Sequence, residues 1–393
     1  MILDSYKSIG GVHPETASIK NILAFNGVKA PHSGKAFTEA MIFGIAGGLG
    51  AMYILWEFEK HGYPSLVVGF RYKGNYSVQY LEQLSSRMGA ESHVYESGGQ
   101  KKALAYLEET LEKGLPAITW MDLGGPPYYM HINLLGVGVV YGIEDGKALV
   151  DKRAKAGFGI PMDALAKARA KVPSFKNRVM SVEPKKDFNL ERAIRDGIGD
   201  CVDYLGAKST SFALPSIRKW ARMMTDEKNE KGWPTVHKNG RGLYGTLRTA
   251  YEAIELTGTG GGGLRGLYAD FLGEAANVLD SAALEDSAQS YRALQAEWSW
   301  LAQAVLPDEV AVFKQTKELL DRKEALILEK GSGAIEQIGP INDELHEIKG
   351  ELNEDFPLDK AGRRELFQEM QSGLNSILEA EHAALEALEA SIA

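Results

Sequence analysis

The spacing of apolar residues changes once along the chain, and this change restricts the fold more than any other feature. Residues 1–155 contain helical spacing together with short β-rich runs such as "PSLVVGFRY" (residues 64–72). From residue 187 onward the spacing is almost entirely helical. A period of two fits a strand and a period of three to four fits a helix. The sequence therefore predicts an α+β protein whose sheet belongs to its first part.

Four segments follow from this pattern: an α/β domain at 1–160, a connector at 161–186, a helical domain at 187–306 and an acidic tail at 307–393. Three strands are predicted between residues 115 and 151, and Asp145-Gly146 is a strong hairpin signal between the last two. The uncharged run from 40 to 56 is Gly-rich and slightly short for a membrane span, so we expect a buried helix or turn there.

The acidity of the chain is concentrated at its C-terminal end. Residues 308–393 hold 20 acidic and 9 basic side chains, a balance of −11, and because the whole chain carries −9 the remainder carries +2. No basic stripe with interleaved aromatic residues is present, so we do not expect a nucleic-acid partner. One cysteine and the absence of a signal-peptide pattern favour a cytoplasmic location. We expect neither membrane association nor a bound cofactor.

The last helix carries an apolar stripe close to heptad spacing, which has to be buried against another surface. We expect a helical hairpin that packs on the body of the chain or on a second subunit, and hence a homo-oligomer formed through the C-terminal helices. The stripe consists of Phe367, Met370, Leu374, Leu378, Leu385, Leu388 and Ile392.

Two glycine-rich segments and the cysteine have competing interpretations. "GIAGGLG" (residues 44–50) lacks the spacing of a dinucleotide-binding loop, and a packing role for these glycines is favoured, with Gly47 supporting the site. "GTGGGGLR" (258–265) is either a helix cap with a flexible connector or a glycine nest that holds an anion beside Arg265. Cys201 lies between acidic neighbours, which raise a thiol pKa, and is predicted to be a packed structural residue.

The start of the first helix is the principal candidate site. In "GGVHPETASIKNIL" (residues 10–23), a glycine pair precedes His13, Pro14, Glu15 and Thr16 and then helical apolar spacing. His131 opens a predicted strand and Asp151 closes the next. A base oriented by an acid on the neighbouring strand, facing a helix N-terminus that stabilises an anion, is the layout of papain-like enzymes. The alternative is a strand histidine and a turn acid without a catalytic role.

These motifs resemble a known family. "HPETASIKNILAFNG", "TEAMIFGIAGGLGAMYILWEF" and "YYMHINLLGVGVVYGIEDGKALVDK" are similar to the N-terminal domain of the butirosin biosynthesis protein H acyltransferases. The helical part, including "IELTGTGGGGLRGLYADFLGEAA", resembles the uncharacterised domain that often follows it. The resemblance covers roughly residues 8–306 and implies a papain-like fold that transfers an acyl group from a carrier-protein thioester to an amine through a cysteine.

The resemblance places that cysteine at position 14, where this chain has proline, and it places the base and its orienting acid at His131 and Asp151. Because proline is no nucleophile, three hypotheses stay open. In the first hypothesis the protein is still an enzyme, similar to an acyltransferase or amidohydrolase. Either the Thr16 or Ser18 hydroxyl attacks the substrate, or His131 and Glu15 act as acid and base. Alternatively, the pocket only binds a ligand or serves as a scaffold.

In the third hypothesis, His13, Glu15, His131 and Asp151 converge on a metal ion. The favoured prediction is an acyl- or amide-transfer enzyme without a cysteine mechanism, acting on a small-molecule or carrier-protein-bound acyl substrate. His131, Asp151 and Thr16 are its predicted catalytic residues. The predicted substrate-binding residues are His13, Glu15, Ser18, Glu39, Gly47 and Arg265.

Overall fold

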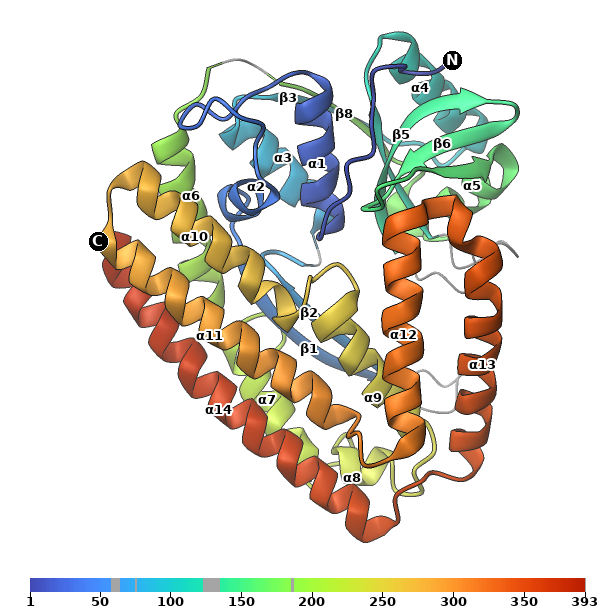
Figure 1. Cartoon of the computed structure of the whole chain (residues 1–393), viewed down its shortest axis with the longest axis vertical. Helices are drawn as coiled ribbons and strands as arrows, with labels where there is room; N and C mark the ends of the chain where they lie inside the picture. The colour runs from blue at the N-terminus through green and yellow to red at the C-terminus, as the bar shows by residue number, and fades with distance from the viewer. Residues whose placement is uncertain (58–63, 75, 123–134, 185–186, 393) are drawn as a thin grey trace. The chain divides into compact units, whose positions relative to one another are not determined.

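The computed structural model describes residues 1–57, 64–74, 76–122, 135–184 and 187–392 (Figure 1). Its contacts divide the chain into two compact units, and this division differs from the four segments predicted from the sequence. Unit 1 comprises Met1–Ile42, Leu81–Leu190 and Lys323–Asn342. Unit 2 comprises Phe43–Tyr80, Glu191–Arg322 and Asp343–Ala393.

Unit 1 is built on an antiparallel sheet of six strands in the order β3-β8-β4-β5-β6-β7. Helix α1 (Pro14–Phe25) contacts β5, and α4 (Gln100–Glu112) and α5 (Met162–Ala170) both contact β4. Buried apolar side chains of these helices and strands form its core. The strands are β3 (Glu91–Tyr95), β4 (Ala117–Asp122), β5 (Leu135–Glu144), β6 (Lys147–Asp151), β7 (Phe158–Pro161) and β8 (Val179–Glu183).

The predicted hairpin is confirmed, because β5 and β6 pair with Glu144 opposite Lys147. Asp145 and Gly146 between them have φ of 48° and 73°, as a two-residue turn of this kind requires. The prediction of a connector at 161–186 was wrong in one respect: besides the helix α5, this segment contains β8, which pairs with both β3 and β4. The segment is therefore part of the sheet, since its short apolar run finds strand partners far away in sequence.

The acidic tail packs on the body of the chain, which is one of the two predicted alternatives. Its helices α12 (Ala311–Lys330) and α13 (Ile335–Glu354) meet at a turn whose residues belong to unit 1. Ile327, Ala334 and Ile338 join the core of that unit. The turn also fits closely against the sheet, because a Cβ on Gly331 would lie 2.2 Å from the Ala156 carbonyl oxygen.

Unit 2 is mostly helical and also contains a two-stranded antiparallel ribbon, β1 (Leu49–Glu57) and β2 (Pro64–Arg71). Strand β1 was missed, since its residues were predicted as a buried helix or turn. The helices are α6 (Leu190–Gly206), α7 (Leu214–Thr225), α8 (Trp233–Val236), α9 (Leu243–Tyr251), α10 (Arg265–Leu279), α11 (Ala282–Val305) and α14 (Lys360–Ile392), with α2 (Glu39–Ile45) and α3 (Ser77–Arg87) shared between the units.

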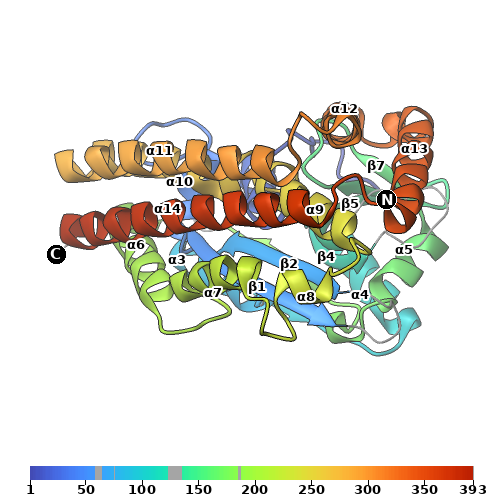
Figure 2. The same cartoon turned by 90° about the horizontal axis from the view of Figure 1, so that it is seen from below.

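The apolar stripe of α14 finds its partner within the same chain. Helix α14 packs against α11 and α7, and Figures 1 and 2 both show it beside α11. Six of the seven predicted stripe residues are buried, and Ile392 is partly exposed. The stripe is thus used in intramolecular packing, and the homo-oligomer stays a prediction.

The glycines from 44 to 50 allow close packing in unit 2, as the sequence suggested. A Cβ on Gly47 would lie 2.5 Å from the Tyr72 ring, and one on Gly48 would lie 2.3 Å from the Tyr268 ring. Both glycines also have positive φ. Among the described helices, none combines the length and the apolar character that a membrane crossing requires.

Candidate active site

Two glycines bring the chain tightly against the start of α1. Gly10 has a φ of +73°, which favours glycine. A Cβ on Gly11 would lie 2.3 Å from the Ala17 Cβ and 2.8 Å from Glu39 Oε2. Only a residue without a side chain fits here, so the glycine pair determines where His13 enters the helix.

Glu39 holds the first turn of α1 in place. Its carboxylate accepts hydrogen bonds from the backbone N–H of His13 at 2.7 Å and of Val12 at 2.9 Å. The Thr16 hydroxyl donates to the same carboxylate at 3.0 Å, and the Lys20 ammonium lies 3.5 Å away. A carboxylate at this position compensates the positive end of the helix. Glu39 therefore organises the site and is fully engaged in doing so.

The His13 ring lies between a hydroxyl and a carboxylate of its own helix. His13 Nδ1 is 3.3 Å from Thr16 Oγ1, and Nε2 is 3.3 Å from Glu15 Oε2. All three residues are buried, Thr16 completely. The Ser18 hydroxyl is directed elsewhere and donates to the Pro14 carbonyl at 2.7 Å. Pro14 occupies the first helical position, where the missing N–H costs nothing.

Asp151 closes β6, as predicted, and binds α1. Its Oδ2 accepts hydrogen bonds from Asn21 Nδ2 at 2.5 Å and from the Tyr6 hydroxyl at 2.8 Å. Burial raises the pKa of Asp151, and the hydrogen bonds from Asn21 and Tyr6 oppose that rise. Oδ1 is also buried and has no hydrogen-bond partner among the residues that the structure describes. The Ser8 hydroxyl also lowers the pKa of Asp151, so it lies close to this carboxylate.

Three residues of this region were missed in the sequence: Tyr6, Asn21 and Lys152. Tyr6 stacks on Tyr141 with ring centroids 4.8 Å apart, which fixes its hydroxyl on Asp151. Lys152 is buried beside Asp151, and burial, followed by the charge of Arg153, lowers its pKa to about 7. Tyr6 and Asn21 lie in apolar patterns that suggest packing, so only the tertiary contacts show their polar function.

Other predicted site residues have different outcomes. His131 lies outside the described residues. Arg265 and Gly47 belong to unit 2. Arg265 is fully buried, and its guanidinium is 2.7 Å from Glu381 Oε1 and donates to the Gly263 carbonyl at 2.8 Å. Because this carboxylate neutralises it away from solvent, Arg265 serves the packing of the helices, and the suggested anion nest is not formed around it.

Cys201 is completely buried, as predicted for a structural residue. Burial is the main cause that raises its thiol pKa to about 11, whereas acidic neighbours had been expected to do so. Within the described ranges, no three His, Cys, Asp or Glu side chains are close enough to hold a metal ion.

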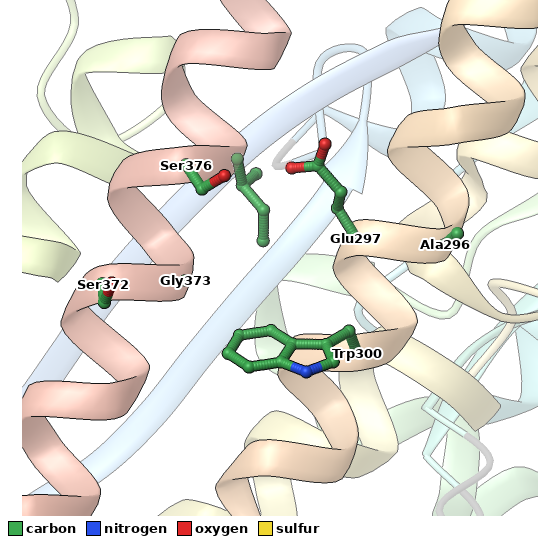
Figure 3. A pocket seen from close by; sticks show the side chains of 7 residues that line it. Ala296, Glu297, Trp300, Ser372, Gly373 and Ser376 are labelled. Carbon is green, nitrogen blue, oxygen red and sulfur yellow. The ribbon is translucent and has the colours of Figure 1, made fainter.

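Described residues of unit 2 line two cavities away from α1. One, of about 560 Å³, lies between α11 and α14 (Figure 3). Glu297 and Trp300 from α11 and Ser372 and Ser376 from α14 line it. The second, of about 620 Å³, is lined by residues of α7, α8 and the start of α14.

Comparison with known families agrees with the resemblance seen in the sequence. Residues 13–152 match the family described as butirosin biosynthesis protein H, N-terminal. Residues 163–325 match one described as a domain of unknown function (DUF4872). The chain thus carries a butirosin biosynthesis protein H-type N-terminal domain followed by a DUF4872 domain. No curated protein matches the chain.

The first match contains most of the cluster around α1, whereas Tyr6, Gly11 and Val12 precede it. It begins at His13 and ends at Lys152, and so includes Glu39 and Asp151. The second match begins inside α5 and ends inside α12, so it also contains β8 of the six-stranded sheet. The last two helices, α13 and α14, lie beyond both matches.

Proposed function

We propose that the chain is an acyl-transfer enzyme of papain-like fold that works without a covalent enzyme intermediate. The match of residues 13–152 supports a biosynthetic acyl-transfer family. Helix α1 supports the papain-like assignment. Its first turn carries the candidate residues, and its Asn21 side chain binds Asp151 at the end of β6. The substrate is an acyl thioester, small or carrier-bound, and the acceptor is an amine.

The observation that carries the mechanism is the buried His13–Glu15 pair, 3.3 Å apart, beside two hydroxyls that are otherwise engaged. Thr16 is completely buried and donates to Glu39, and Ser18 donates to Pro14. Neither hydroxyl therefore suits a nucleophile, whereas an imidazole next to a carboxylate suits a general base once the acceptor nitrogen replaces Thr16 beside His13 Nδ1.

In the proposed step, the acceptor nitrogen attacks the thioester carbonyl carbon, a C–N bond forms and the C–S bond breaks. His13 takes the proton from the nitrogen and returns a proton to the departing sulfur, while Glu15 stabilises the imidazolium. His131 is proposed as a second proton-transfer group, oriented by Asp151, whose Oδ1 has no hydrogen-bond partner among the described residues.

The test is thiol release from a panel of acyl-coenzyme A thioesters with amine acceptors, combined with intact-protein mass. His13→Gln should lower turnover by about 100-fold or more, the range of general-base catalysis. The control Thr16→Val keeps the shape of the residue and should retain turnover within about tenfold. An acyl adduct on Thr16, or equal losses in both variants, would contradict the proposal.

One observation favours a second candidate, a protein that binds a ligand without turnover. Glu39 already occupies the N–H groups of Val12 and His13, where an oxyanion could otherwise be stabilised. In the same assay this candidate predicts no thiol release from any donor, together with saturable binding of an acyl donor measured by calorimetry.

A further inference from the structure

The cavity beside the start of α14 has an unusual charge. Lys238, Lys360, Arg363 and Arg364 line it, and Glu227 is the single acidic residue among its described lining. The balance is therefore +3, in a chain with a net charge of −9. In the described part of the chain, none of the four cationic side chains forms an ion pair. Unpaired cations that share one cavity create a strongly positive potential there.

Arg363 fixes the geometry of this cavity. Its guanidinium donates to the Leu358 carbonyl at 2.7 Å and to the Lys238 carbonyl at 3.1 Å. It thereby connects the chain before α14 with the loop after α8. Lys238, Lys360 and Arg364 are exposed, so their charged groups are accessible to a ligand from solvent.

Buried apolar side chains also line the cavity. Phe367 and Met224 are buried lining residues, and Trp233 contacts the Phe367 ring edge-on with centroids 5.7 Å apart. His237 is 1% exposed, and its Nδ1 lies 3.4 Å from the Arg241 carbonyl oxygen. Its Nε2 is buried and has no hydrogen-bond partner among the described residues.

The state of His237 determines what it offers. Burial lowers its pKa to about 4, so the ring is neutral near pH 7. With Nδ1–H directed to the carbonyl, Nε2 is an acceptor that can receive a hydrogen bond from a ligand hydroxyl or amine. A buried polar atom without a partner is costly, and a bound ligand would remove that cost.

We infer that this cavity binds a small organic phosphate, with its phosphate groups on Lys238, Lys360, Arg363 and Arg364 and its organic part on Phe367, Met224 and His237. Guanidinium and ammonium groups pair well with phosphate oxygens. The volume of about 620 Å³ lies within the range of small-molecule sites. This inference does not depend on the acyl-transfer proposal, because every lining residue belongs to unit 2.

The test is calorimetric titration of the full chain with ATP, which combines a polyphosphate with an aromatic base, and with pyrophosphate and adenosine separately. We expect ATP to bind at one site per chain and more tightly than either part. Lys238→Ala combined with Arg364→Ala should weaken ATP binding by about tenfold or more, since charge-assisted contacts of this kind are lost. Lys349→Ala is the control, because Lys349 is an exposed lysine of α13 outside the cavity lining.

Two results would overturn the inference. One is the absence of binding of ATP and pyrophosphate at about 5 mM, where even a weak millimolar site would be partly filled. The other is an ATP affinity in the double variant equal to that of Lys349→Ala. Pyrophosphate binding as tightly as ATP would refute the role of the apolar part. Glu227→Gln gives an independent check, since loss of the acidic residue should strengthen ATP binding.

Discussion

Removal of the Glu39 carboxylate should loosen the start of α1 and with it the whole candidate site. In Glu39→Ala, the backbone N–H groups of Val12 and His13 and the Thr16 hydroxyl all lose their acceptor. These donors lie in a region from which water is largely excluded, since Glu39, His13 and Thr16 are all buried. The variant therefore tests whether this carboxylate holds the helix start.

The magnitude follows from the contacts. A hydrogen bond to a charged group contributes about 1.5–3 kcal/mol, and a carboxylate at a helix N-terminus about 0.3–1 kcal/mol. Two backbone bonds and the helix contribution together predict a loss of about 4 kcal/mol in the free energy of unfolding for Glu39→Ala. Glu39→Gln keeps one acceptor oxygen and should lose about 1–2 kcal/mol.

The assay is urea unfolding, combined with hydrogen exchange at the Val12 and His13 amides as a local measurement. Both amides should exchange much faster in Glu39→Ala than in the wild type. The control is Glu191→Gln, an exposed acid in the first turn of α6, which should change stability by less than about 0.5 kcal/mol. A loss below about 1 kcal/mol for Glu39→Ala, with unchanged amide exchange, would refute the reasoning.

Three further predictions concern other parts of the molecule. Glu381→Leu should cost about 3–5 kcal/mol because it leaves Arg265 buried without its partner. Adding Arg265→Met should recover part of this loss in a urea double-mutant cycle, since the Trp298 indole N–H still lacks the Glu381 acceptor. Burial lowers the pKa of His237 from 6.5 to about 4 in the folded chain. As the pH falls from 6.5 to 4, the unfolded chain binds a proton at His237 before the folded chain does, so the free energy of unfolding should drop by about 3 kcal/mol. This drop should be absent when the pH-dependent unfolding of His237→Gln is measured. Gly11→Ala should lower the thermal midpoint, at a cost of about 1–3 kcal/mol from its close contacts, whereas Gly350→Ala, with open space around it, should not.

The local sequence was sufficient to predict elements that are stabilised by residues close to them in the chain. The β5–β6 turn at Asp145-Gly146 was predicted correctly because both positions need positive φ, which these residue types tolerate. Helix α6 lies in the region that was predicted to be helical, because its spacing alone defines one buried face. Strand β1 was missed, since an apolar Gly-rich run fits a buried helix as well as a strand, and only pairing with β2 distinguishes the two.

At the candidate site, too, the local sequence predicted some features and the tertiary structure decided the others. The sequence by itself determined that a helix starts at His13-Pro14, and that position 14 carries no thiol. It could not show that Glu39 occupies the first turn or that Asn21 and Tyr6 hold Asp151, because those partners lie 23 to 145 residues apart.

Arg265 illustrates the limit most clearly. Its place beside four glycines suggested an anion site, but a carboxylate 116 residues later neutralises it inside the helical unit. The sequence determines which local conformations and charges are present. Only the tertiary structure decides which charges meet, because a charge taken out of water has to be paired, and the fold alone brings its partner within reach.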